Sequence, residues 1–191
     1  MAVKAGSGEA WTTETLSRIP ADRPSLDEMA AEARARPGTL RLAPRGDQEI
    51  LIARAFAAPA AAVFRAWTDA AVARQWLGGP DFPILEAAID PVPGGAYRYV
   101  LGDRQGRIMS WGGTFTAVEP DRALRATEWF DPAWYPGETR LALELREAEG
   151  ETVALLTLGY ESVAARSQVL RSPMDHGLAA AFDRLAALLA R

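Results

Sequence analysis

The sequence contains no cysteine and one histidine, His176. Without thiols the chain can form neither disulfide bonds nor thiolate metal sites, and it lacks a thiolate nucleophile. A histidine metal site needs further ligands nearby, and none stands at a usable spacing from His176. We therefore predict no metal site and no cofactor.

The sequence also has no excess of positive charge: it contains 21 Lys and Arg residues and 25 Asp and Glu residues, which gives a net charge of −4. Phosphate-rich partners need a basic face, which argues against nucleic acids and membrane surfaces as partners. No apolar run approaches the roughly 20 residues of a membrane span, and the N-terminus has no apolar signal core. These features favour a cytoplasmic protein.

Familiar catalytic motifs are absent from the sequence. There is neither a Gly-x-Ser-x-Gly elbow nor a His-Glu-x-x-His helix. The pair Gly94-Gly95 is interpreted as a turn, because no helix start follows it as a phosphate loop requires. Function must therefore be sought among aromatic residues and carboxylates.

The chain divides by composition into an extension, residues 1–45, and a main domain, residues 46–191. The extension has few large apolar residues, but Ser25 and Glu28 form a capping-box pattern that predicts a helix over about 25–36, ending at Pro37-Gly38. We interpret the extension as an arm that packs on this chain or on a partner. A partly disordered tail is the alternative.

From Thr39 the pattern becomes strand-like, and segments 39–43 and 49–57, on either side of the boundary, predict a hairpin or one bent strand. Pro59 suits the first turn of a helix, and Thr68-Asp69 can cap a second helix that ends near Trp76. Ser172-Pro173 opens a last, long helix with a broad apolar stripe. Between these helices, turn residues separate six candidate strands: 84–90, 96–102, 107–118, 123–129, 139–148 and 152–161.

This order predicts an α+β fold in which a curved antiparallel sheet of about seven strands wraps on the long C-terminal helix. The concave face of such a sheet must be covered, and this helix is the only element large enough to cover it. We expect a cavity wherever the sheet and the helix do not meet.

Several motifs resemble the START/birch-pollen-allergen-like (SRPBCC) superfamily, and within it the branch named after the activator of heat-shock-protein ATPase. The resemblance covers 49–191 and implies the helix-grip fold. It departs from the family pattern at Pro173-Met174, where Gly-Met is usual, and in the first 45 residues. The matching residues are Arg54, Phe56, Ala58, Pro59, Val63, Phe64, 66–69, Trp76, Asp90, Gly94, Gly95, Tyr97, Tyr99, Gly113, Phe115, Pro120, Leu124 and 127–129.

Aromatic residues are the main candidates for ligand binding. Strand alternation places Tyr97 with Tyr99, and Trp111 with Phe115, on shared faces. On the concave side they would line an apolar pocket with polar handles, and Trp134 and Tyr135 could form a lid; the alternative is that they only fill the core. The predicted ligand-binding residues are Trp76, Tyr97, Tyr99, Trp111, Phe115, Trp129, Trp134, Met174, Leu178 and Phe182.

Acid–base candidates are fewer. A carboxylate in an apolar cavity has a raised pKa and can exchange protons near neutral pH, whereas a strand-edge salt bridge is the simpler interpretation of the same residue. His176 lies off the apolar stripe of its helix, which favours a solvated side chain. The catalytic candidates are Tyr97, Tyr99, Glu128, Asp90 and His176.

Three functions are compatible with the sequence. The first is binding of a hydrophobic small molecule, lipid-like or polyketide-like, between the sheet and the last helix. The resemblance also implies an enzyme of the polyketide cyclase or dehydratase type, or a co-chaperone-like interaction module. A homodimer through the N-terminal arm or a sheet edge is a further alternative.

Overall fold

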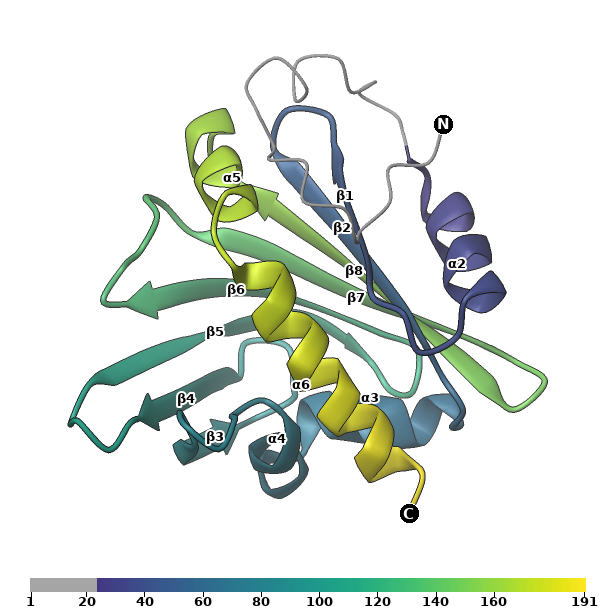
Figure 1. The fold of residues 1–191 in the computed structure, drawn as a ribbon, viewed down its shortest axis with the longest axis horizontal. Helices are drawn as coiled ribbons and strands as arrows, with labels where there is room; N and C mark the ends of the chain where they lie inside the picture. The colour runs from purple at the N-terminus through teal and green to yellow at the C-terminus, as the bar shows by residue number, and fades with distance from the viewer. Residues whose placement is uncertain (1–23) are drawn as a thin grey trace.

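In the computed structural model, which describes residues 24–191, eight strands form one antiparallel sheet in the order β1-β2-β8-β7-β6-β5-β4-β3 (Figure 1). The expected helix-grip fold is confirmed, and the sheet has one strand more than expected because the first two strand-like segments form a hairpin. The strands are β1 (Arg41–Arg45), β2 (Glu49–Phe56), β3 (Ile84–Ile89), β4 (Ala96–Gly102), β5 (Ile108–Glu119), β6 (Ala123–Asp131), β7 (Thr139–Ala148) and β8 (Glu151–Tyr160).

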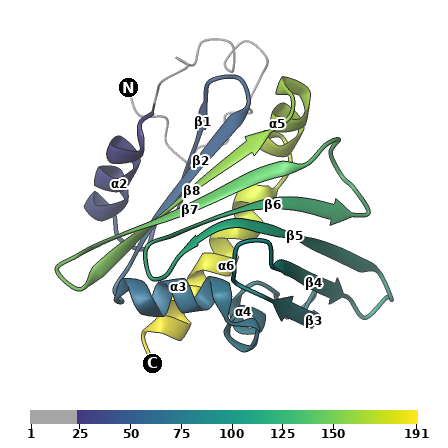
Figure 2. The ribbon, with the colours of Figure 1, turned by 180° about the vertical axis from the view of Figure 1, so that it is seen from behind.

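Helices cover both faces of the sheet in part. The longest, α6 (Met174–Leu189), crosses the inner face, whereas α2 (Leu26–Ala35) packs on the outer face of β1, β2 and β8 (Figures 1 and 2). Two short helices, α3 (Ala60–Thr68) and α4 (Ala70–Trp76), follow β2, and α5 (Val163–Leu170) precedes α6.

The side chains of strand β2 alternate between the inner core and a second core beneath α2. Ile50, Ile52 and Phe56 face the inner core, and Leu51 and Ala53 face α2 on the outer side. Because helices cover both faces here, every residue of β2 after its first is buried, and the strand has a nearly continuous apolar sequence.

The outer helix α2 begins with a complete capping box. The Ser25 hydroxyl accepts a hydrogen bond from the Glu28 backbone at 3.2 Å, and the Glu28 carboxylate accepts one from the Ser25 backbone at 2.8 Å. Met29, Ala30 and Ala33 are buried against the sheet. The expected boundary at residue 45 falls inside the β1–β2 hairpin, so β1 is structurally part of the sheet.

The helices around α6 differ from the sequence expectation in two places. The segment of α5 was not predicted as a helix because it is short, although the Ser162 hydroxyl caps it by accepting a hydrogen bond from the Ala165 backbone at 3.1 Å; it packs against β8 and α6. Pro173, rather than Ser172, is the N-cap of α6; the Ser172 hydroxyl donates to the Val169 carbonyl at the end of α5 and accepts from the Met174 backbone at 3.3 Å. Asp69 caps α4 as expected. Within residues 24–191 no helix is both long and apolar enough to cross a bilayer.

Candidate functional site

Glu128 lies on the inner face of β6, where its neighbours in alternation, Ala126 and Phe130, pack with the main core. Its side chain is half-buried. The Tyr97 hydroxyl, from β4, donates to the Thr127 carbonyl at 2.9 Å and lies 3.4 Å from Glu128 Oε2. A carboxyl group is thus held against a phenol within the apolar side of the sheet.

A continuous series of aromatic rings accompanies this carboxyl. The ring centroids of Tyr97 and Tyr99 are 5.9 Å apart, those of Tyr99 and Trp111 5.0 Å apart, and those of Tyr135 and Tyr160 5.4 Å apart. Strands β4, β5, β6 and β8 and the loop before β7 contribute rings. We call these residues the aromatic set: Tyr97, Tyr99, Trp111, Phe115, Phe130, Trp134, Tyr135 and Tyr160.

A glycine makes the contact between Tyr97 and Glu128 possible. Gly113 on β5 pairs with Tyr97, and a Cβ atom there would lie 1.7 Å from the Thr127 carbonyl oxygen and 3.0 Å from the Tyr97 ring. Because Gly113 has no side chain, the Tyr97 ring can cross β5 and reach β6.

Burial sets the electrostatics of the site. It raises the pKa of Glu128 to about 7, and the hydrogen bond with Tyr97 opposes this rise. Burial also raises the pKa values of Tyr97, Tyr99 and Tyr160, and the negative charge of Glu128 raises them further. The carboxyl can therefore take up or release a proton near neutral pH, whereas the phenols stay protonated.

The aromatic set borders a part of the inner face that α6 covers thinly. Helix α6 packs mainly on α3, α4, α5 and β2. Trp111, Phe130, Trp134, Met174 and Leu178 pack against the core but remain half-buried. These residues form an apolar rim that solvent reaches.

Two shallow hollows open on the surface, and both lie away from the aromatic set. One adjoins the β1–β2 turn, and the other lies between α3, α4 and the end of α6. Neither is lined by the aromatic set, whose rings lie against one another. Neither hollow corresponds to the expected cavity between the sheet and α6.

Five of the ten predicted ligand-binding residues come together in this region. Tyr97, Tyr99, Trp111, Phe115 and Trp134 belong to the aromatic set, whereas Met174 and Leu178 pack half-buried against the main core. Gln168 on α5 donates to the Trp134 carbonyl and so fixes the loop that carries Trp134 and Tyr135.

Trp76 and Phe182 lie in the same main core but belong to a second group of ring contacts. Together with Phe56 and Trp67 they pack where α3 and α4 meet α6. Trp76 is 1% exposed, and its indole Nε1 donates to the Ala66 carbonyl at 2.9 Å. With its ring buried and its polar atom bonded, Trp76 serves the core of the fold.

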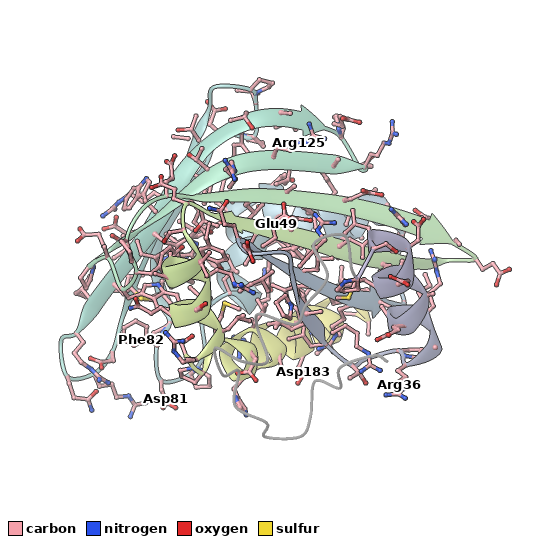
Figure 3. The ribbon with its side chains drawn as sticks, turned by 90° about the horizontal axis from the view of Figure 1, so that it is seen from above. Arg36, Glu49, Asp81, Phe82, Arg125 and Asp183 are labelled. Carbon is pink, nitrogen blue, oxygen red and sulfur yellow. The ribbon has the colours of Figure 1, made fainter. Side chains whose placement is uncertain are left out.

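Trp129 lies on the outer face of the sheet, because it pairs with Gly112 while its neighbours Glu128 and Phe130 face inward. It is 39% exposed. Arg125, four residues earlier on β6, is exposed on the same outer face (Figure 3). Trp129 therefore does not join the aromatic set.

The acid–base candidates separate in the same way. Tyr97, Tyr99 and Glu128 lie together. Asp90 is exposed at the end of β3, and the His176 side chain is 86% exposed and pairs with Asp175. His176 is thus solvated, as its position off the apolar stripe of α6 predicted.

Sequence reasoning missed Phe130 and Tyr160. Phe130 stands two residues after Glu128, so alternation alone could have placed it on the same face. Tyr160 required the pairing of β7 with β8, which puts it opposite Thr139. Among residues 24–191 no group of three or more His, Asp or Glu side chains is placed to hold a metal ion.

Comparisons with known proteins agree with this architecture. The family described as activator of Hsp90 ATPase homolog 1-like protein matches residues 57–190. A protein of known structure from Rhodobacter sphaeroides is 28% identical, with a TM-score of 0.76 over 80% of this chain and 99% of its own. A Mycobacterium smegmatis protein is 23% identical, with a TM-score of 0.67 over 75% and 91% of the two chains.

The AHSA1 protein from Silicibacter pomeroyi is 20% identical, with a TM-score of 0.60 over 74% of this chain and 97% of its own. At these identities the Mycobacterium and Silicibacter proteins establish the fold alone. No curated protein matches the sequence.

Proposed function

This chain belongs to the activator of Hsp90 ATPase homolog 1-like family, and on that premise we propose that it binds a hydrophobic small molecule at the aromatic set. The observation that carries the proposal is the gathering of eight aromatic rings, of which Tyr97 contacts Glu128, on a part of the inner face that α6 covers thinly. Rings offer large apolar area, and the carboxyl and phenols offer the few polar contacts that orient a ligand.

The rim indicates where a ligand would enter. Trp134 comes from a loop, and Met174 and Leu178 come from the first turns of α6, so these side chains can separate without disrupting a strand pair. A ligand that buries about 200 Å² of apolar surface gains about 5 kcal/mol before the costs of association, so apolar contact alone supports at most submillimolar affinity and polar contacts must supply the rest.

The two faces of the sheet supply a matched test. Trp111 lies in the aromatic set and Trp129 lies on the outer face, so both can be replaced by alanine and titrated with the neutral fluorescent probe N-phenyl-1-naphthylamine. We expect Trp111→Ala to weaken binding about tenfold and Trp129→Ala to leave it unchanged. Equal affinities in all three proteins, or no binding by the unaltered protein, would refute the proposal.

A second candidate is acid–base catalysis on a polyketide-like substrate. The observation that favours it is the position of Glu128 on the apolar face of β6, 3.4 Å from the Tyr97 hydroxyl, where burial raises its pKa to about 7 and lets one carboxyl remove and return a proton at neutral pH. In such a step Glu128 removes the proton between two carbonyl groups, and the bonding electrons move to a carbonyl oxygen as an enolate.

Proton exchange tests that candidate without a known substrate. Benzoylacetone dissolved in D2O exchanges the protons between its carbonyl groups, and NMR measures the rate. We expect the protein to accelerate this exchange and Glu128→Gln to remove the acceleration. If both proteins give the uncatalysed rate, acid–base chemistry of this kind is excluded.

A further inference from the structure

Glu128 has no cationic partner among the residues that the structure describes. Its carboxyl takes part in no ion pair there, and the Tyr97 hydroxyl, at 3.4 Å, is its hydrogen-bond neighbour. Other carboxylates of the sheet, such as Glu49 and Glu144, are paired with arginines. A half-buried carboxyl among apolar rings is harder to ionise without a cation beside it, and a ligand can supply the missing charge.

The surroundings of Glu128 are suited to a positive charge. The faces of tyrosine and tryptophan rings attract cations, and phenol oxygens can accept hydrogen bonds from an ammonium group. Tyr97, Tyr99, Tyr135 and Tyr160 are each close enough to Glu128 for its charge to raise their pKa values. Carboxyl, phenols and ring faces thus converge on one place from β4, β6, β8 and the loop before β7.

We propose that the ligand is a hydrophobic organic cation, an amine whose ammonium group pairs with Glu128 while its apolar part lies against the aromatic set. This inference rests on the proposed binding function and names its ligand class. A carboxylate ligand is disfavoured because it would bring a second negative charge beside Glu128. A neutral ligand would leave the carboxyl unpaired.

Proton release distinguishes a cation from the other ligand classes. An ammonium group beside Glu128 lowers the pKa of the carboxyl from about 7 towards its ordinary value. At pH 7 about half of the Glu128 side chains are protonated before binding, so the cation should displace about half a proton per ligand. A neutral ligand displaces none.

Three indole compounds of similar size provide the test: tryptamine (a cation), tryptophol (neutral) and indole-3-acetate (an anion). Calorimetric titrations of the full chain in buffers of different ionisation enthalpy give both affinity and proton release. At about pH 8 we expect tryptamine to bind at least about tenfold more tightly than tryptophol, and indole-3-acetate to bind most weakly. The preference should shrink towards about pH 5.5, where Glu128 is protonated.

Two variants locate the effect. Glu128→Gln should abolish both the preference for tryptamine and the proton release, while tryptophol still binds and demonstrates that the variant is folded. Glu86→Gln is the same change at an exposed position, and it should leave the preference for tryptamine and the proton release unchanged.

Two outcomes would overturn the inference. Tryptophol binding as tightly as tryptamine, or a preference that survives Glu128→Gln, would refute the cation and leave the binding site intact. Failure of all three compounds and of N-phenyl-1-naphthylamine to bind would refute the proposed function as well.

Discussion

The guanidinium of Arg54 on β2 lies 2.7 Å, Nη1 to Oδ1, from the carboxylate of Asp183 on α6. Arg54 occupies an inner-face position between Ile52 and Phe56, and its side chain is 4% exposed, whereas that of Asp183 is 68% exposed. The guanidinium carbon also lies 5.7 Å from the centre of the Phe56 ring. A cation buried in the sheet is thus matched by a carboxylate on the helix that crosses it, as the position of Asp183 on α6 in Figure 3 illustrates.

Asp183→Asn should therefore destabilise the fold. The neutral amide leaves the buried Arg54 guanidinium with a weaker partner, and we expect the free energy of unfolding to fall by about 1–2 kcal/mol in urea denaturation. Asp81→Asn removes the same charge from an exposed loop and should change stability by less than about 0.5 kcal/mol. Equal stability of the two variants would show that the ion pair contributes nothing.

Glu128 should make stability depend on pH. Its pKa is about 7 in the folded protein and 4.5 for the ordinary side chain, so between these pH values the folded state binds the proton more tightly than the unfolded state. Stability from this group is therefore fully present below about pH 4.5 and is lost as pH rises to about 7.

The variant Glu128→Gln should lack this loss. The free energy of unfolding of the variant should exceed that of the unaltered protein by on the order of 1–3 kcal/mol at about pH 7.5. The lower figure allows for solvent screening of a half-buried group. Urea denaturation at several pH values measures the difference. Parallel stability profiles for the two proteins would contradict the raised pKa.

Two glycine substitutions test the close approach of β5 and β6. The Cβ of Gly113→Ala would collide with the Thr127 carbonyl and the Tyr97 ring, so we expect a loss of about 1–3 kcal/mol in the free energy of unfolding. In Gly177→Ala the new methyl group meets open space within α6, and alanine should stabilise the helix by about 0.5–1 kcal/mol. Thermal unfolding should therefore shift in opposite directions, and a shift in the same direction would be inconsistent with the packing at Gly113.

Trp76→Phe separates the second group of ring contacts from the proposed site. The change removes the indole hydrogen bond to the Ala66 carbonyl and part of a buried ring, which should cost about 2 kcal/mol of stability. Binding of N-phenyl-1-naphthylamine, measured well below the melting temperature, should remain unchanged. A loss of affinity comparable to that of Trp111→Ala would place Trp76 in the binding site instead.

Local signals in the sequence predicted much of the fold. Turn residues such as Gly94-Gly95 separated the strands, the Asp69 cap divided two helices, and the apolar stripe of α6 identified the helix on the sheet. These features depend on residues a few positions apart, whose effect on the backbone is the same in most contexts. The helix α5 escaped prediction because it is short, and it packs against distant elements.

The residues of the candidate site were predicted less completely than the fold, because contacts between distant parts of the chain decide which residues meet there. Alternation indicates which residues share a face of a strand, but it does not indicate which face lies inward. In β6 this choice separates Glu128 and Phe130 from Trp129, and a register irregularity between Phe115 and Ala117 in β5 complicates it further. Tyr160 joins the aromatic set through the pairing of β7 with β8, which no local pattern specifies.

The sequence by itself determined the order of the elements and their turns and caps, because these follow from residue type and near-neighbour spacing, and its motifs indicated the family by their resemblance to it. Only the tertiary structure decided that Glu128 stands among aromatic rings without a cationic partner in the described residues, that Trp129 points away from them, and that Trp76 belongs to the core. Those outcomes depend on strand register and on which half of the sheet α6 covers, and both are set by packing between residues far apart in the chain.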